Sequence, residues 1–323
     1  MEEIGKLKGA TVLVTGGAGF IGSHIAEKLV GIGAKVRILD NFSAGKLDNI
    51  RDFEKRVDII EGDVTDLSLL LEVMKGVEYV SHQAALRSAP KSVSLPQLYT
   101  RVNVEGTLNV LIAAKERGVK RVVYASSSSV YGDNLQLPQK EEHYPSPLTP
   151  YATSKLAGEF YCSLFTKTYG LETVSLRYFN VFGPRQSLES QYAVVIPKFI
   201  NCILKDQPPP IHGDGKQSRD FTYVDNVVYA NLLAMVREGV EGRVFNTGEG
   251  KTVTILELVE ELSSLARKEV KPVFTPPRPG DPPHTMADLT LAKELLGYTP
   301  QVSFQEGLKK TFEWFSRLWE RRE

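Results

Sequence analysis

The stretch TGGAGFIG, residues 15–22, determines how the first half of this sequence is interpreted. It lies between a β-rich run, ATVLVTG at 10–16, and an apolar helical pattern over residues 20–33. Its glycines fit Gly-x-x-Gly-x-x-Gly from Gly16 and Gly-x-Gly-x-x-Gly from Gly17. Glycines between a strand and a helix let the backbone approach a pyrophosphate, and the first N–H groups of the helix face that anion. The stretch therefore predicts a dinucleotide-binding turn.

An acidic residue at the end of the next predicted strand supports this interpretation. Asp40 follows the glycine turn by about twenty residues, the usual position of the carboxylate that binds the adenosine ribose. A carboxylate there repels a 2′-phosphate, so NAD is favoured over NADP. Asp63 and Val64 end the third predicted strand, and Ala84 and Ala85 end the fourth, where the rest of such a cofactor would lie.

The first half of the chain alternates between strand and helix patterns. Predicted strands cover 10–16, 35–40, 57–63, 77–85, 121–128 and 173–180, and predicted helices cover 20–33, 67–76, 97–118 and 150–170. Nearly all-apolar strands separated by helices indicate an α/β fold, a Rossmann-type doubly wound parallel sheet. We expect residues 1–180 to form this domain. Residues 181–323, with Pro- and Gly-rich loops and helices near 192–204, 223–237 and 254–268, would form a smaller mixed region that binds substrate, with some segments returning to the sheet.

Composition excludes several classes of function. The 323 residues are 42% hydrophobic and 24% charged, which suits a large core, and 39 Lys plus Arg balance 39 Asp plus Glu. Without a basic excess we expect no nucleic-acid partner. Cys162 and Cys202 have no metal-type spacing, and we expect no metal. We also expect a cytoplasmic protein without a membrane partner, because the first residues are charged and no apolar run reaches spanning length.

The sequence TPYATSK, residues 149–155, places a tyrosine and a lysine one helical turn apart. This spacing alone usually means a half-buried aromatic beside a solvated charge. Here it follows the serine-rich end of a strand, ASSSSVYGD at 125–133, at the sheet edge where ligands bind in such folds. Lysine stabilises a phenolate, so Ser127, Tyr151 and Lys155 could remove a hydroxyl proton while a hydride leaves the same carbon.

Together these motifs resemble the extended short-chain dehydrogenase/reductase family. The resemblance spans nearly the whole chain and includes HQAA at 82–85, LRYFNVFG at 176–183, RDFTYVDN at 219–226 and RPGD at 278–281. Within the family the pattern is most similar to UDP-hexose 4-epimerases, of the UDP-N-acetylglucosamine and UDP-glucose type. The resemblance implies NAD contacts at Gly16, Gly19, Phe20, Ile21, Gly22, Asp40, Asn41, Ser43, Gly45, Asp63, Val64, Ala84, Ala85, Arg87, Asn103, Ser127, Tyr151, Lys155 and Tyr178. It implies UDP-sugar contacts at Ser88, Ser129, Tyr151, Asn180, Val194, Arg219, Arg278, Asp281 and Thr285.

The resemblance implies epimerisation at C4 of a UDP-hexose through a 4-keto sugar, by a homodimer with bound NAD. One alternative is a UDP-glucuronate 4-epimerase, because Arg185 could hold the carboxylate of the sugar. Another is a sugar-nucleotide dehydratase or decarboxylase. Those last enzymes carry carboxylates where this chain has Ser128 and Ser129. A non-catalytic NAD-binding protein is the remaining class. The small Thr285, at the position that gates the 2-substituent, predicts that N-acetylated UDP-hexoses fit, although Arg87 and Val194 could narrow the pocket.

Overall fold

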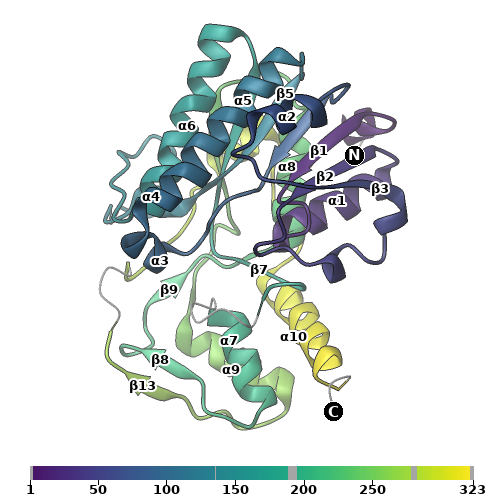
Figure 1. The fold of residues 1–323 in the computed structure, drawn as a ribbon. Helices are drawn as coiled ribbons and strands as arrows, with labels where there is room; N and C mark the ends of the chain where they lie inside the picture. Colours follow the sequence, from purple (N-terminus) through teal and green to yellow (C-terminus); the bar gives the residue numbers. More distant parts are fainter. Residues whose placement is uncertain (1–2, 135, 188–194, 278–281, 321–323) are drawn as a thin grey trace.

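The computed structural model describes residues 3–134, 136–187, 195–277 and 282–320. Its centre is a seven-stranded parallel sheet in the order β11-β6-β5-β4-β1-β2-β3 (Figure 1). The strands are β1 (Thr11–Thr15), β2 (Lys35–Asp40), β3 (Val57–Glu61), β4 (Tyr79–His82), β5 (Arg121–Ser127), β6 (Glu172–Tyr178) and β11 (Arg243–Thr247). The strand numbers increase away from β1 in both directions. The strand ends next to β1 therefore form the topological switch point where such sheets bind ligands.

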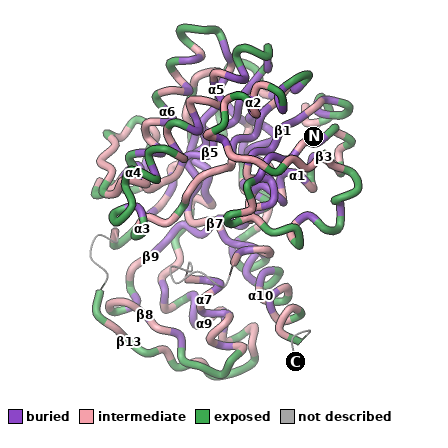
Figure 2. Tube along the Cα trace, viewed as in Figure 1, coloured by how far each residue is buried: buried purple, intermediate pink, exposed green. Residues whose placement is uncertain are grey.

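Helices cover both faces of the sheet because residues along each strand alternate between two cores. Val12 and Val14 of β1 belong to the core beneath α1 (Phe20–Ile32) and α8 (Val224–Val236). Leu13 belongs to the opposite core, which packs against α2 (Leu67–Val73), α5 (Gly106–Glu116) and α6 (Pro150–Tyr169). Burial of both faces explains the apolar strand sequences. Figure 2 shows the strands as a buried layer between the half-exposed helices.

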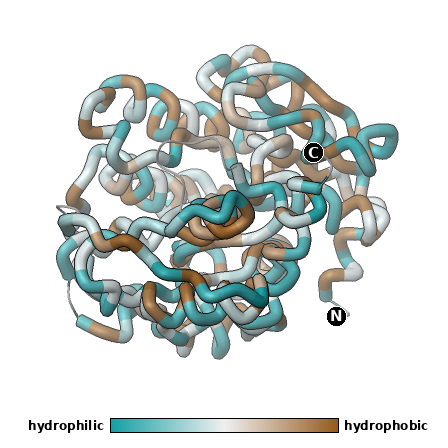
Figure 3. Tube along the Cα trace, turned by 90° about the horizontal axis from the view of Figure 1, so that it is seen from below, coloured by the Kyte–Doolittle hydropathy of each residue, from teal (hydrophilic) through white to brown (hydrophobic). Residues whose placement is uncertain are grey.

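The second half of the chain has its own core below the sheet. This core brings together α7 (Val195–Leu204), α9 (Ile255–Ala266) and α10 (Phe304–Glu320) around phenylalanine rings such as Phe182, Phe221 and Phe304. Figure 3, seen from below, shows hydrophobic and hydrophilic residues interspersed along the chain. Its short strands pair two by two: β7 (Val181–Phe182) with β10 (Thr222–Tyr223), β8 (Pro210–His212) with β13 (Val273–Thr275), and β9 (Ser218–Arg219) with β12 (Val253–Thr254).

The helix predicted over 97–118 is present from Pro96 to Glu116, but it is not a single α-helix. After the short α3 (Ala89–Ser94), the chain forms α4 (Pro96–Tyr99), a π-helical segment η4 (Thr100–Glu105) and then α5. A π-helical turn inserts one residue into an α-helix and is frequently found at functional sites. Short 3₁₀ or π segments also occur at η1 (Glu3–Leu7), η2 (Leu47–Asn49), η3 (Glu54–Arg56), η5 (Ser128–Tyr131) and η6 (Ala292–Leu296). None of the helices in the described part of the chain is long and apolar enough to cross a membrane.

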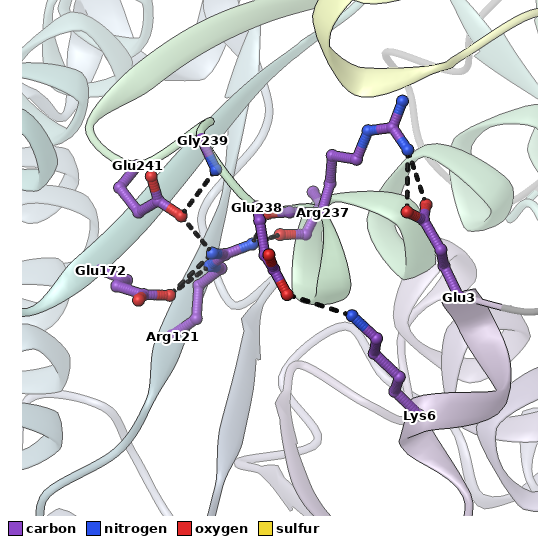
Figure 4. Close-up of polar contacts among 9 residues, drawn as sticks. Glu3, Lys6, Arg121, Glu172, Arg237, Glu238, Gly239 and Glu241 are labelled. Atoms are coloured by element: carbon purple, nitrogen blue, oxygen red, sulfur yellow. Dashed lines mark hydrogen bonds and ion pairs between the residues drawn. The ribbon is translucent and has the colours of Figure 1, made fainter.

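An ion-pair network closes the amino end of the sheet (Figure 4). Arg121, the first residue of β5 and 3% exposed, lies 2.7 Å from the carboxylates of both Glu172 and Glu241. Its guanidinium also donates to the Ala234 carbonyl. Since parallel strands start at this edge and end at the other, the network lies opposite the predicted site and serves stability.

Candidate active site

The glycine turn has the geometry that its sequence predicts. Gly16 has φ +67°, a left-handed conformation, and a Cβ there would lie 2.8 Å from the Ala84 nitrogen. A Cβ on Gly22 would lie 2.1 Å from the Gly16 oxygen, so helix and turn can pack this closely only with glycine. Gly19 is the N-cap of α1, and no described side chain caps this helix end. The first N–H groups of α1 are thus left to bind an anion.

Asp40 fixes the loop that follows the turn. Its buried carboxylate accepts hydrogen bonds from the Ala18 N–H and the Phe42 N–H, both at 2.9 Å. Burial raises the pKa of Asp40, and these two N–H donors lower it. Next to it, Asn41 donates to Asp63 at 2.7 Å. The two acidic residues predicted from the strand ends therefore lie at one rim, joined through Asn41.

A cavity of about 640 Å³ runs along this rim to the end of β5. Most of the predicted cofactor residues line it: Gly16, Gly19, Phe20, Ile21, Gly22, Asp40, Asn41, Ser43, Gly45, Asp63, Val64, Ala84, Ala85, Arg87, Tyr151, Lys155 and Tyr178. Asn103 and Ser127 are not among the lining residues. The cavity also has lining residues that sequence reasoning missed, notably Gln186 after β7 and Trp314 and Leu318 of α10. The sequence gives no signal for Trp314 and Leu318, because their apolar side chains are explained by the amphipathic pattern of α10.

Tyr151 and Lys155 lie in the first two turns of α6. Thr149 caps the helix by accepting the Ala152 N–H at 3.2 Å, and Pro150 is its first residue. The Lys155 ammonium donates to the Ala125 carbonyl at 2.8 Å and lies over the Tyr124 ring, 5.1 Å from its centroid. Burial lowers the pKa of Lys155 to about 8, so at neutral pH it remains mostly charged.

The environment of Tyr151 has opposing effects on its hydroxyl. Burial raises the pKa of Tyr151, whereas a hydrogen bond with the Ser127 side chain and the positive charge of Arg87 lower it. Ser127, at the end of β5, accepts the Ser129 N–H at 3.2 Å. Sequence-predicted Ser127, Tyr151 and Lys155 are thus brought together at the carboxyl edge of the sheet.

Asn103 lies in the π-helical segment and joins the cofactor side to the catalytic helix. Its side chain accepts the Leu86 N–H at 2.8 Å and donates to the Leu86 carbonyl at 2.9 Å. It also donates to the Ser154 hydroxyl at 3.0 Å, between Tyr151 and Lys155. Asn103 is therefore a positioning residue in this structure and does not line the cavity.

Behind Asn103 runs a chain of buried hydrogen bonds that sequence reasoning missed. His82 contacts Thr15 through Nδ1 at 2.7 Å and Thr107 through Nε2 at 3.0 Å. The Thr107 hydroxyl donates to the Asn103 carbonyl, so it must accept from Nε2–H of His82. Burial lowers the pKa of His82 to about 3, which keeps the ring neutral. The glycine turn and the π-helical segment are thereby linked through one imidazole of defined tautomer.

The described substrate residues lie in separate segments of the chain, and two of them, Arg219 and Thr285, are linked through Ser218. Arg219 of β9 donates to the carbonyls of Ser218 and Pro283, and the Thr285 N–H donates back to the Ser218 carbonyl at 3.2 Å. The Asn180 carbonyl accepts the Thr222 N–H, which fixes the start of this region. Ser88 caps α3, and the buried Ser129 hydroxyl has no hydrogen-bond partner among the described residues. Val194, Arg278 and Asp281 lie outside the described residues.

Arg185 is turned toward the cofactor side. Its guanidinium donates to Glu27 of α1 at 2.6 Å and lies 6.0 Å from the Phe53 ring centroid. It also lines the cavity. The ion pair with Glu27 uses Nη2, whereas the buried Nη1 has no hydrogen-bond partner among the described residues.

Comparison with known proteins connects this geometry to a family. The model of the NAD dependent epimerase/dehydratase family matches residues 12–248. The chain belongs to this family. A solved UDP-N-acetylglucosamine 4-epimerase from Methanobrevibacter ruminantium M1, in complex with UDP-N-acetylmuramic acid, is 42% identical, with TM-score 0.92 over 96% of this chain and 99% of that one.

Two further members of the epimerase/dehydratase family differ in the sugar they are named for. The UDP-glucose 4-epimerase of Mycolicibacterium smegmatis is 37% identical over 94% of this chain and 97% of its own. A solved UDP-glucuronic acid 4-epimerase from Bacillus cereus, in complex with UDP-glucuronic acid and NAD, is 32% identical, with TM-score 0.89 over 95% of this chain and 99% of that one. The family's Rossmann-type fold and use of NAD are therefore those of this chain.

Proposed function

We propose that this protein is an NAD-dependent 4-epimerase of UDP-hexoses. The observation that carries the proposal is that Tyr151 and Lys155 line one end of the cavity that the glycine turn and Asp40 begin, with Ser127 hydrogen-bonded to Tyr151. The family members named above as UDP-sugar 4-epimerases support the same activity. The residues fit NAD: an uncapped helix end for the pyrophosphate and an acidic rim for the adenosine ribose.

Tyr151 is the proposed base and acid. NAD held by the glycine turn and the Asp40 rim would supply reversible hydride-transfer chemistry at the sugar's C4. The Tyr151 phenolate takes the proton of the 4-hydroxyl, directly or through Ser127, and gives it back after the hydride returns to the opposite face. The positive charge of Arg87 favours the phenolate, and the Lys155 ammonium, one helical turn from Tyr151, is proposed to act in the same direction. Because the oxidation and the reduction cancel, NAD needs no replacement between turnovers.

The alternative functions named from the sequence have less support. Elimination or decarboxylation requires a carboxyl group beside the catalytic hydroxyl, and Ser128 and Ser129 offer none. A UDP-glucuronate 4-epimerase requires a partner for the sugar carboxylate, and the Arg185 guanidinium is already paired with Glu27. A non-catalytic NAD-binding protein would have no need of the buried Lys155 charge.

The activity is tested with purified protein and no added NAD. We expect UDP-galactose or UDP-N-acetylgalactosamine to be converted to its 4-epimer by cofactor retained from expression. Conversion of UDP-glucuronate, without conversion of the other UDP-hexoses, would indicate a UDP-glucuronate 4-epimerase instead. Absence of turnover with every UDP-hexose, by protein that contains NAD, would exclude the epimerase.

Within this activity, we propose that N-acetylated UDP-hexoses are accepted. Thr285 is small and is held beside Arg219 through Ser218. A tyrosine at this position would fill the space of an acetamido group but leave room for a hydroxyl. Thr285→Tyr should therefore suppress turnover of UDP-N-acetylgalactosamine at least tenfold and spare UDP-galactose, whereas Thr285→Ser should preserve both. Equal turnover of the two substrates by Thr285→Tyr would show that Thr285 is not the gate.

We further propose that the protein is a cytoplasmic homodimer formed through α4 and α6. Four apolar side chains on or beside these helices are exposed: Leu95 (48%), Leu98 (44%), Phe160 (64%) and Leu164 (46%). A cluster of this kind on two packed helices suits a four-helix contact with a second copy. Phe160→Glu should convert the dimer into a monomer in sedimentation experiments. A monomeric wild-type protein would contradict the proposal.

A further inference from the structure

Asp220, between β9 and β10, is a buried charge with no cationic partner among the described residues. Its side chain is 0% exposed. Among the described residues its hydrogen-bond donors are three backbone N–H groups and one hydroxyl, that of Thr222 at 3.3 Å. Burial raises the pKa of Asp220 to about 6, so the carboxylate is charged at neutral pH. A buried carboxylate with four donors organises the groups around it, because each donor would be unpaired without it.

The donors come from two segments that are distant in sequence. One oxygen, Oδ1, accepts the Glu249 N–H at 2.7 Å, and the other, Oδ2, accepts the Gly250 N–H at 3.0 Å and the Ala287 N–H at 3.1 Å. Gly248 permits this approach, since a Cβ there would lie 2.8 Å from Oδ2. Asp220 therefore joins the turn after β11 to the segment that contains Ala287.

Those same segments contain the predicted UDP-sugar contacts. Arg219 directly precedes Asp220 and donates to the Pro283 carbonyl at 3.2 Å. Thr285 lies two residues before Ala287, and its hydroxyl accepts the Asp220 N–H at 3.4 Å. Asp220 thus contacts the Thr285 side chain through its backbone and the Thr285 segment through its carboxylate.

We propose that Asp220 is a positioning residue that holds Arg219 and Thr285 in register for the UDP-sugar. The inference rests on the proposed function and deepens it. Asp220 is not among the described residues that line the cofactor cavity, so we expect its effect on the substrate side. Without the carboxylate, the segment at 282–288 would keep its backbone bonds to Ser218 and Gln139 and its side-chain bonds, but the bond at Ala287 that ties it to residues 249–250 would be lost.

The test is Asp220→Asn, which turns an NH₂ group toward backbone N–H donors and removes the charge. We expect the KM for the UDP-sugar and the Kd of UDP, measured by calorimetry, to rise at least tenfold, with kcat reduced less than threefold. NAD content should equal that of wild type. Asp214→Asn is the matched control, because Asp214 is an exposed aspartate of the same region that also accepts a backbone N–H, from Lys216. It should change neither constant.

Several outcomes would overturn the inference. An Asp220→Asn variant with wild-type KM and UDP affinity refutes it, as does a variant whose kcat and NAD content fall while UDP affinity stays. If that variant does not fold, Thr222→Val, which removes only the hydroxyl donor, decides: a two- to fivefold rise in the Kd of UDP supports the inference, and no change refutes it. Absence of turnover by the wild-type enzyme would instead count against the proposed function, and UDP affinity would still test Asp220.

Discussion

Replacing Lys155 by methionine should make the protein more stable while abolishing its proposed activity. Burial lowers the pKa of this lysine from 10.5 to about 8. A shift of that size corresponds to about 3 kcal/mol of destabilisation by the charged form, at 1.36 kcal/mol per unit. Methionine also removes the hydrogen bond from the charged ammonium to the Ala125 carbonyl, which contributes about 2 kcal/mol. The net expectation is a gain of about 1 kcal/mol in the free energy of unfolding at pH 7.

The assay is urea unfolding of cofactor-free protein at several pH values. Between about pH 8 and 10.5 the unfolded wild type binds more protons than the folded one at this lysine, so wild-type stability rises with pH in that window. The advantage of Lys155→Met should therefore be present at pH 7 and shrink as the pH passes from 8 to 10.5. Turnover should fall by about two orders of magnitude or more, because the phenolate loses its counter-charge.

Lys167→Met provides the control, since Lys167 is an exposed lysine on the same helix. We expect its stability to stay within about 0.5 kcal/mol of wild type at every pH. A Lys155→Met variant that is less stable than wild type at pH 7 would refute the reasoning. A gain that does not change with pH would also refute it, because the gain would then come from packing and not from the charge.

Further predictions concern the base, the cofactor and the ion-pair network. Tyr151→Phe should keep the fold and the bound NAD but lose two to three orders of magnitude in turnover, the range of a lost general base; near-normal activity would remove Tyr151 from that role. Cofactor extracted from purified protein should be NAD, since Asp40 repels a 2′-phosphate, and recovery of mainly NADP would contradict this. Arg121→Met should lower the free energy of unfolding by roughly 3 kcal/mol, because Glu172 and Glu241 lose their shared cation, with little effect on KM in the folded protein.

Much of the sheet could be predicted from sequence because its signals are local. Each apolar run became a strand, and the glycine turn, Asp40 and the Thr149–Pro150 helix start lie where their chemistry places them. Asn103 shows the limit of this reasoning. Nothing in VNVEG distinguishes an α-helix from a π-helix, since the extra residue is selected by the bonds that Asn103 makes to Leu86 and Ser154.

The unpredicted part of the site depends on contacts between distant segments. Trp314 and Leu318 reach the cavity only because α10 packs below the sheet. The ion pair of Arg185 with Glu27 joins residues 158 positions apart. Asp220 has an ordinary acidic side chain in the sequence, and its four donors become visible only when residues 249–250 and 287 are folded beside it.

The return of α8 and β11 to the central sheet limits how chimeras of this chain and its relatives can be built. The chain leaves the sheet after β6, comes back for residues 224–247, and leaves again. The lower core is consequently encoded in two blocks, one on either side of a sheet segment. A chimera that exchanges sugar specificity between relatives must transplant both blocks together. A single crossover near residue 180 would instead place a foreign strand against β6 and a foreign helix against α1.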